Sequence, residues 1–246
     1  MEVRIPTRLK ASVLETELRE MTLQTGQLVL ALGGSKSGKS KLLETWAQEM
    51  ASAWQVPLLY LATLEVGEDA ENQARVDRHR AQRAGKGFET LEATCNLPQN
   101  VCSDSLNAQP VLLLECLGTL TANEIFSPRN QARQASWGLP SHYDQAPERG
   151  LADKIACDLL KDLAWLQKQT SLLLIASNDV FSNCPAPDPW SQLWLETLGL
   201  VHRGLAQDPA CWLLEVAAGL PLAWSGPGLP PSLKNNLGIL PLADWP

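Results

Sequence analysis

The sequence predicts an α/β fold in which helices flank an open, mostly parallel sheet, and three observations support this prediction. Five short runs are almost continuously apolar, as strands are when both faces of a parallel sheet are covered. Segments with the apolar spacing of helices separate several of these runs, and such alternation favours right-handed crossovers. A glycine-rich turn follows the first run directly, at the point where a helix-period segment begins.

The predicted elements follow one another in a regular order along the chain. The apolar runs predict strands at 27–32, 56–62, 111–117, 171–177 and 211–217. Apolar residues recur three and four positions apart over 42–54, 151–166 and 190–205, which predicts three amphipathic helices. Together these elements define one domain, expected to extend over 27–224.

Three regions fall outside this alternation. Residues 1–26 precede the first predicted strand and are expected to form an N-terminal extension. Residues 127–150 contain turn-forming residues without periodicity, which predicts a long surface loop inserted in the domain. The segment 225–246 is rich in proline and glycine and is expected to be a tail.

Composition narrows the class of protein. The 246 residues are 45% hydrophobic and 19% charged, which is enough to build a core. The formal net charge of −7 argues against general nucleic-acid binding. None of the six cysteines forms a C-x-x-C pair, and no signal peptide or stretch of membrane-spanning length is evident. We therefore expect a cytoplasmic protein with reduced cysteines.

The glycine-rich turn, GGSKSGKS, fits the phosphate-binding pattern G-x-x-x-x-G-K-[ST]. In such a loop the backbone N–H groups surround phosphate oxygens, Lys39 supplies a positive charge, and the Ser40 hydroxyl can ligate Mg²⁺. The helix that follows directs its partial positive charge at the same anion. A turn that binds nothing is the less favoured alternative. The predicted nucleotide-binding residues of the loop are Gly33, Gly34, Ser35, Lys36, Ser37, Gly38, Lys39 and Ser40.

An acidic residue at the end of a neighbouring strand is the second part that nucleotide chemistry requires. Glu115 holds this position in the apolar run VLLLECL. Its alternative is a solvated carboxylate at a strand end. Beside a phosphate-binding loop we favour the metal-binding role, so that Ser40 and Glu115 are the predicted Mg²⁺ ligands.

A histidine lies among arginines in a segment that has few large apolar residues. On a helix, Arg75, His79 and Arg83 would share one face, with Arg80 beside them. Neighbouring cations disfavour protonation of the imidazole, which leaves it neutral and able to act as a nucleophile. A solvated, charged helix with an incidental histidine is an equally good interpretation of the periodicity alone.

Several stretches in this order resemble one known family. The stretches are GGSKSGKS, LYLAT at 59–63, RVDRHRAQR at 75–83, FETLEA at 88–93 and LLLECLGTLTAN at 112–123. They resemble the bifunctional adenosylcobinamide kinase/adenosylcobinamide-phosphate guanylyltransferases of cobalamin biosynthesis. The resemblance continues more weakly through LLLIASNDV at 172–180 and on to about Pro221.

This resemblance implies a P-loop NTPase fold with a RecA-like sheet, and a homotrimer. It implies that adenosylcobinamide is phosphorylated with ATP or GTP, and that GMP then passes from GTP through a guanylylated histidine to give adenosylcobinamide-GDP. The family histidine corresponds to His79, which with Lys39 is the expected catalytic pair. Besides the loop, the nucleotide-binding residues implied are Thr63, Arg80, Ala81, Gln82, Arg83, Glu92 and Glu115.

The C-terminal half departs from the family pattern. Phe181 stands where the family has glycine, and His202-Arg203 replaces an Asn-Gln pair. His202 could replace a polar contact of the family, but we favour a polar residue at the edge of an amphipathic helix. Two alternatives therefore stay open beside the bifunctional enzyme. One is a P-loop small-molecule kinase or NTPase of the same descent, with a changed acceptor or without guanylyl transfer. The other is a non-catalytic nucleotide-binding protein.

Overall fold

The computed structural model describes residues 26–65, 77, 80, 81, 83–140, 144–181 and 188–225. The expected N-terminal extension and the tail after Ser225 lie outside these residues, as do His79 and Gln82. No helix within the described ranges is long and apolar enough to cross a membrane.

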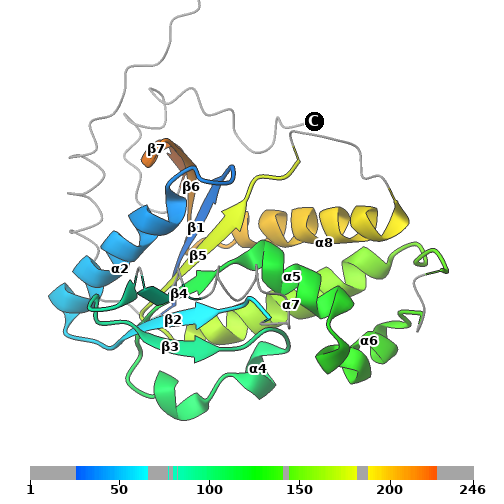
Figure 1. Ribbon diagram of the computed structural model, residues 1–246, viewed down its shortest axis with the longest axis horizontal. Helices are drawn as coiled ribbons and strands as arrows, with labels where there is room; N and C mark the ends of the chain where they lie inside the picture. The colour runs from blue at the N-terminus through cyan, green and yellow to red at the C-terminus, as the bar shows by residue number, and fades with distance from the viewer. Residues whose placement is uncertain are drawn as a thin grey trace, which may run out of the picture.

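A seven-stranded sheet forms the centre of the molecule (Figure 1). Its strands are β1 (Gln27–Gly33), β2 (Leu58–Ala62), β3 (Glu89–Glu92), β4 (Val111–Glu115), β5 (Leu172–Asn178), β6 (Cys211–Ala217) and β7 (Leu220–Ser225). Their order across the sheet is β3-β2-β4-β5-β1-β6-β7, and all neighbouring pairs are parallel except the antiparallel pair β6 and β7. The predicted mostly parallel sheet is confirmed.

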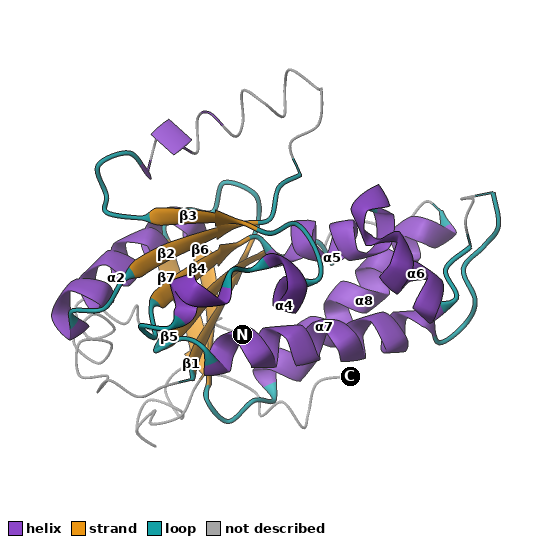
Figure 2. Cartoon of the chain, turned by 90° about the horizontal axis from the view of Figure 1, so that it is seen from below, coloured by secondary structure: helices purple, strands orange, loops and turns teal. Residues whose placement is uncertain are grey.

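Helices lie on both faces of this sheet (Figures 1 and 2). The α-helices are α2 (Lys39–Trp54), α4 (Leu97–Asn100), α5 (Leu117–Phe126), α6 (Gln131–Trp137), α7 (Leu151–Lys168) and α8 (Pro189–Ala206). One face packs against α2, and the other packs against α4, α5, α7 and α8. The three helices predicted from apolar stripes correspond to α2, α7 and α8.

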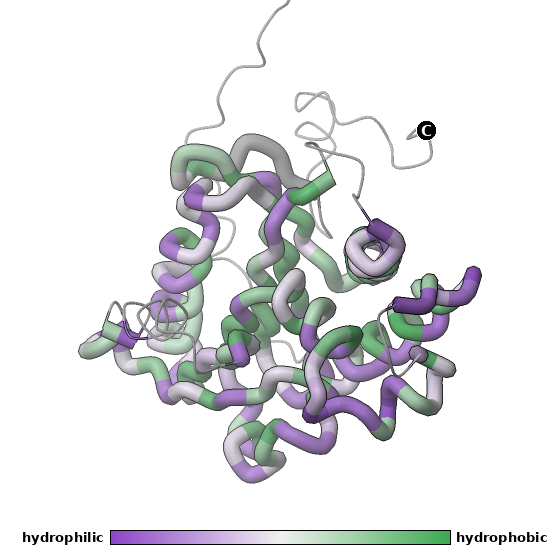
Figure 3. The backbone as a smooth tube through the Cα atoms, turned by 45° about the vertical axis from the view of Figure 1, so that its right-hand side comes forward, coloured by the Kyte–Doolittle hydropathy of each residue, from purple (hydrophilic) through white to green (hydrophobic). Residues whose placement is uncertain are grey.

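The core consists of two apolar layers that the sheet separates. Alternate residues of each strand enter opposite layers, so that Leu28 and Leu30 meet α7 and α8 while Val29 and Ala31 meet α2. In Figure 3 the strands at the centre are mostly green, whereas polar and apolar residues alternate along the outer helices. Burial on both faces explains why the strands appear in the sequence as continuous apolar runs.

Two strands escaped prediction, and both lie at an edge of the sheet. The four residues of β3, ETLE, are mostly exposed, so that no apolar run marks them. At the opposite edge, β7 contains Pro221, which is tolerated only where a backbone N–H is not needed for pairing. The predicted end of another strand also shifts, because β4 stops at Glu115 and Leu117 already begins α5.

The prediction of an irregular loop over 127–150 is wrong for its first part. A 3₁₀ turn covers Pro128–Asn130 and α6 covers Gln131–Trp137, with Trp137 only 4% exposed. Seven residues make too short a helix to show periodicity, and Gly138 ends it in the left-handed conformation (φ 82°). Residues 128–137 of the inserted segment therefore pack onto the domain.

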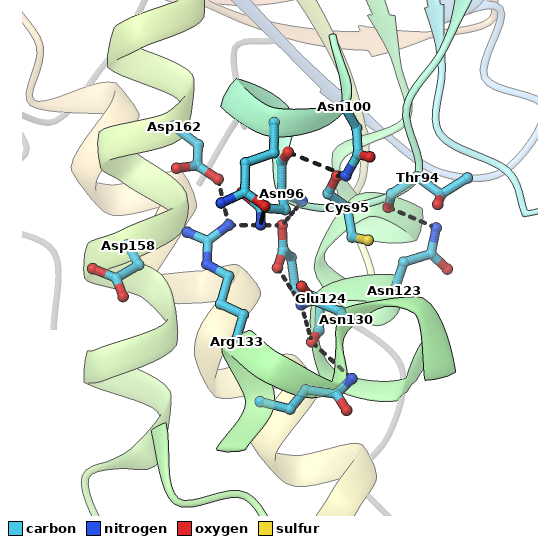
Figure 4. Close-up of polar contacts among 12 residues, drawn as sticks. Thr94, Cys95, Asn96, Asn100, Asn123, Glu124, Asn130, Arg133, Asp158 and Asp162 are labelled. Atoms are coloured by element: carbon cyan, nitrogen blue, oxygen red, sulfur yellow. Dashed lines mark hydrogen bonds and ion pairs between the residues drawn. The ribbon is translucent and has the colours of Figure 1, made fainter. Parts of the chain in front are cut away.

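A buried polar cluster attaches this segment to the helical layer (Figure 4). Glu124, which is fully buried, accepts hydrogen bonds from the Asn96 backbone N–H at 2.7 Å and from Asn130 Nδ2 at 2.6 Å. Arg133 Nη1 lies 3.3 Å from Glu124 Oε1 and 2.5 Å from Asp162 Oδ2. Burial raises the pKa of both carboxyl groups, and Arg133 opposes that rise. The cluster joins α5, α6 and α7 to the loop that follows β3.

Candidate active site

The glycine-rich turn forms a compact loop between β1 and α2. It reverses direction through two residues in the left-handed region, Lys36 (φ 60°) and Gly38 (φ 88°), and the Ser37 backbone N–H donates to Gly34 O at 3.1 Å. Lys39 is the first residue of α2, and its side chain lies back along the loop with Nζ 3.3 Å from Gly34 O. The residue is 6% exposed, and burial lowers the pKa of its amine.

The β6–β7 hairpin packs against this loop. Its turn residue Gly219 donates its backbone N–H to Ser37 O at 2.6 Å. A Cβ atom at Gly38 would lie 2.6 Å from Gly219 Cα, and one at Gly33 would lie 2.4 Å from Val216 O. Both loop glycines are thus required by close backbone approach, and Gly38 also by its positive φ. Sequence analysis missed the hairpin's part, because nothing local in β6 or β7 points to the loop.

Glu115 lies where the sequence predicted, at the carboxyl end of β4 and facing the loop. Ser40 Oγ donates to Glu115 Oε1, and the Tyr60 hydroxyl donates to Oε2 at 3.3 Å. Ser40 and Glu115 therefore place a hydroxyl and a carboxylate side by side, the oxygen donors that Mg²⁺ prefers. In the described part of the chain no group of three or more His, Cys, Asp or Glu residues could hold a metal ion. Two protein ligands are enough for Mg²⁺, because this ion usually keeps several waters and also binds substrate phosphates.

Thr63 has a buried side chain that ties two strand ends together. Its hydroxyl donates to Cys116 O at 3.0 Å and accepts from the Cys116 backbone N–H at 2.8 Å. Asn123 of α5 then donates to both Thr63 O, at 2.7 Å, and Thr94 O, at 3.0 Å. These bonds set the relative positions of the ends of β2, β3 and β4. The predicted role of Thr63 in nucleotide binding stays a prediction, and Asn123 was not singled out from the sequence.

Arg83, at the end of the basic segment, packs against Tyr60 of β2. It is 7% exposed, and its Cζ lies 3.5 Å from the centroid of the Tyr60 ring. Its Nε and Nη1 atoms are buried without a hydrogen-bond partner, which is costly for a charged donor. Such unpaired nitrogens are suited to receive an anion.

The other predicted residues of this segment are less enclosed. Arg80 and Glu92 form an ion pair at 2.5 Å with both side chains about half exposed (50% and 57%), and Ala81 is also exposed. Lys86 pairs with Glu44 of α2 at 2.5 Å, which anchors the end of the segment beside α2. His79 and Gln82 lie outside the described residues, so their predicted roles stay predictions.

The end of β5 lies next to the phosphate-binding loop, because the Asp179 backbone N–H donates to Gly33 O at 3.0 Å. Close by, His202 of α8 is only 8% exposed, with Nε2 2.8 Å from Ser177 Oγ. The Phe181 ring meets the His202 ring edge-on at a centroid distance of 5.7 Å. The expectation that His202 is a polar residue at the edge of an amphipathic helix is therefore wrong, because α8 buries it against β5.

We expect His202 to make stability depend on pH. Burial lowers its pKa from 6.5 to about 4, although the charge of Asp179 opposes this shift. As pH falls, the unfolded chain binds a proton near pH 6.5 while the folded protein does not until about pH 4. The free energy of unfolding should fall by about 2 kcal/mol between pH 7 and pH 5 from this residue.

Urea denaturation of wild-type protein and of His202→Gln at both pH values measures this contribution. The glutamine does not titrate, so the variant should lose about 2 kcal/mol less than wild type over the same interval. Equal losses would show that His202 is not the group responsible, whatever the absolute stability of the variant.

A loop that connects a buried strand to a helix, with its lysine buried and its serine bonded to a strand-end carboxylate, defines a P-loop nucleotide-binding protein. The sequence profile of one family within this class, described as "Cobinamide kinase / cobinamide phosphate guanyltransferase", matches residues 29–224. The chain therefore belongs to this family of enzymes, and the resemblance found in the sequence is confirmed.

Curated relatives agree with this assignment. The chain is 24% identical over 194 residues to the "Bifunctional adenosylcobalamin biosynthesis protein CobU" of Escherichia coli, covering 78% of this chain and 98% of that protein. It is 39% identical over 88 residues to the "Bifunctional adenosylcobalamin biosynthesis protein CobP" of Pseudomonas aeruginosa, covering 36% of this chain and 47% of that protein.

The chain is also similar, at a greater distance, to solved structures. They include the flagellar accessory protein FlaH of Methanocaldococcus jannaschii, which has a TM-score of 0.42 and 12% identity over 85% of this chain and 79% of that chain. A KaiC-like protein of Pyrococcus horikoshii has a TM-score of 0.41 and 13% identity over 86% and 82% of the two chains. At these scores the likeness carries no part of the assignment.

Proposed function

We propose that this enzyme phosphorylates adenosylcobinamide with ATP or GTP, and then transfers GMP from GTP to the product through a guanylylated His79. The observation that carries the first step is the contact between Ser40 and Glu115 beside the buried amine of Lys39. Family membership supports the identity of the acceptor and the second step. The protein would therefore bind two substrates, a nucleoside triphosphate and a corrinoid.

In the kinase step, the acceptor hydroxyl oxygen bonds to the γ-phosphorus while the bond to the bridging β–γ oxygen breaks. The nucleoside diphosphate leaves, and the hydroxyl proton passes to solvent. Lys39 and the loop N–H groups stabilise the negative charge on the transferring group. Ser40 and Glu115 would hold Mg²⁺, which when bound neutralises charge on the β- and γ-phosphate oxygens.

In the guanylyl step, the neutral imidazole of His79 attacks the α-phosphorus of GTP and pyrophosphate leaves. The phosphate of adenosylcobinamide phosphate then attacks the same phosphorus, the bond to histidine breaks, and adenosylcobinamide-GDP forms. Two successive displacements at the α-phosphorus replace a single direct displacement that would be more difficult. The unpartnered nitrogens of Arg83 support this step, because they offer a nearby site for a phosphate.

Incubating the purified protein with adenosylcobinamide, Mg²⁺ and GTP labelled in turn at the γ- and α-phosphates tests this proposal. We expect γ-label to enter the corrinoid first and α-label to follow as the GDP derivative. Transfer of γ-label alone would favour the kinase without guanylyl transfer. Absence of label in any corrinoid would reject the proposed substrate.

An acceptor other than adenosylcobinamide is the second candidate, and one observation favours it. Phe181 is 47% exposed near the end of β5, and its ring lies 3.5 Å from where a side chain at Gly199 would begin. A bulky ring therefore packs against α8, two residues after Asp179, at the position where the family resemblance implies glycine. Transfer of γ-label to other alcohols but not to the corrinoid would identify this case.

Two further properties belong to this proposal. The family resemblance implies a homotrimer, which sedimentation equilibrium of the purified protein would test by mass. It also implies a cytoplasmic enzyme, because both nucleotide substrates are cytoplasmic. Fractionation of the source cells would show whether the protein occurs with the cytosol.

Glu115→Gln should raise the Mg²⁺ concentration needed for half-maximal phosphoryl transfer by at least about tenfold. The amide keeps the size of the side chain and can still accept from Ser40, but it lacks the negative charge that attracts the cation. A titration of initial rate against Mg²⁺ measures the change. Glu89→Gln, on the exposed part of β3, is the matched control and should leave the titration unchanged. Identical titrations for both variants would demote Glu115 to a structural strand end.

A further inference from the structure

Tyr60 of β2 contacts both Glu115, beside the phosphate-binding loop, and Arg83. The residue is 4% exposed, and its hydroxyl donates to Glu115 Oε2 at 3.3 Å. One face of its ring carries the Arg83 guanidinium, with Cζ 3.5 Å from the ring centroid. Phe88 meets the ring edge-on, at a centroid distance of 6.1 Å and an interplanar angle of 86°.

The hydroxyl of Tyr60 has a defined direction. The phenol O–H is the donor and Glu115 Oε2 is the acceptor, because an ionised carboxylate has no proton to donate. Glu115 consequently has one oxygen bonded to Ser40 and the other to Tyr60. Hydrogen bonds of this kind orient a carboxylate for the metal it binds.

The ring of Tyr60 has a separate effect on Arg83. A cation over an aromatic face is attracted by the ring without using its hydrogen-bond donors. Nε and Nη1 of Arg83 are buried and have no hydrogen-bond partner. The guanidinium is thus held against the ring with two of its N–H donors unpaired.

We propose that Tyr60 is a positioning residue that links Glu115 to Arg83. Its hydroxyl orients the Glu115 carboxylate, and its ring holds Arg83 for the nucleotide phosphates. This inference rests on the proposed function of Glu115 and Arg83. It assigns two separable tasks to one side chain.

Two substitutions separate the tasks. Tyr60→Phe removes the hydroxyl and keeps the ring, so it should affect only the carboxylate. Tyr60→Leu removes both, while remaining apolar and close in size. Equilibrium binding of a fluorescent GTP analogue, titrated with Mg²⁺, reports each task without relying on catalysis.

We expect Tyr60→Phe to need about tenfold more Mg²⁺ for half-maximal binding, with an unchanged Kd at saturating Mg²⁺. Tyr60→Leu should show the same Mg²⁺ shift and, in addition, a Kd about threefold to tenfold higher at saturating Mg²⁺. Formation of the α-labelled protein adduct should slow in the leucine variant alone.

A third variant keeps the test decisive if Tyr60→Leu fails to fold. Arg83→Met retains an apolar stem against the ring and removes the charge, so it should raise the Kd without moving the Mg²⁺ requirement. A Mg²⁺ titration of Tyr60→Phe that matches wild type would overturn the orienting role of the hydroxyl. An unchanged Kd in Tyr60→Leu, or in Arg83→Met if the leucine variant does not fold, would overturn the role of the ring.

The wild-type protein separates this inference from the function on which it rests. Mg²⁺-dependent binding of the GTP analogue by wild type, with variants that behave like it, would reject the role of Tyr60 alone. Absence of Mg²⁺-dependent binding by wild type would reject the proposed function, and this inference with it.

Discussion

Lys39→Ala is expected to lower the rate of phosphoryl transfer by several orders of magnitude. The amine lies inside the loop, 6% exposed and 3.3 Å from Gly34 O, where negative charge gathers in the transition state. Water cannot replace it effectively, because the loop backbone encloses the position. The fold should persist, because Leu43, Trp46 and Ala47 hold α2, the helix that begins at Lys39, in the core.

The measurement is the single-turnover rate with γ-labelled nucleotide and saturating acceptor. Lys41→Ala is the matched control, because Lys41 is exposed two residues further along α2, and this variant should transfer phosphate at close to the wild-type rate. Circular dichroism would confirm that both variants fold. A folded Lys39→Ala protein with near-normal transfer would refute the assignment of the loop.

His79→Ala should abolish both the covalent GMP adduct and the formation of adenosylcobinamide-GDP, while the kinase step largely persists. The reason is that the kinase step uses Lys39 and Mg²⁺, whereas only guanylyl transfer needs a nucleophile on the protein. Wild-type protein incubated with α-labelled GTP should retain label in a form that acid releases and alkali does not, as a phosphorus–nitrogen bond to imidazole behaves. Label at the γ-position should not be retained, because it leaves with pyrophosphate.

His142→Ala serves as the control, because that histidine has no assigned role in either step. Its adduct should match that of wild type. Retention of α-label by His79→Ala would assign the nucleophile to another residue. Wild-type protein that forms no adduct, yet phosphorylates the corrinoid, would favour an enzyme that has kept only the kinase step.

Local patterns in the sequence were sufficient for the central strands and the phosphate-binding loop. The central residues of strands β1, β4 and β5 are buried on both faces of the sheet, so they are apolar and form runs that are visible in a single sequence. The edge strand β3 has no such requirement, and its ETLE residues could not be told from a turn. Helix α6 was missed because its anchor, Trp137, is a single apolar residue rather than a stripe.

The residues of the loop were predictable for a related reason. The geometry of Gly33–Ser40 is set within eight consecutive residues, whose spacing is itself the signal. Glu115 was predictable from its place at the end of an apolar run. His202 was not, because helical spacing alone put it at the edge of a stripe, and only packing against Ser177 shows that it is buried.

By itself, then, the sequence determined the class of fold, the phosphate-binding loop and the acidic residue at the neighbouring strand end. Tertiary structure alone decided which residues complete the site. Glu115 meets Ser40 across 75 positions of sequence and Tyr60 across 55, and Gly219 approaches the loop from the far end of the domain. Such contacts arise from the strand order β3-β2-β4-β5-β1-β6-β7, which brings together residues that are far apart in the chain. The sequence around each of these residues contains no pattern that predicts the contact.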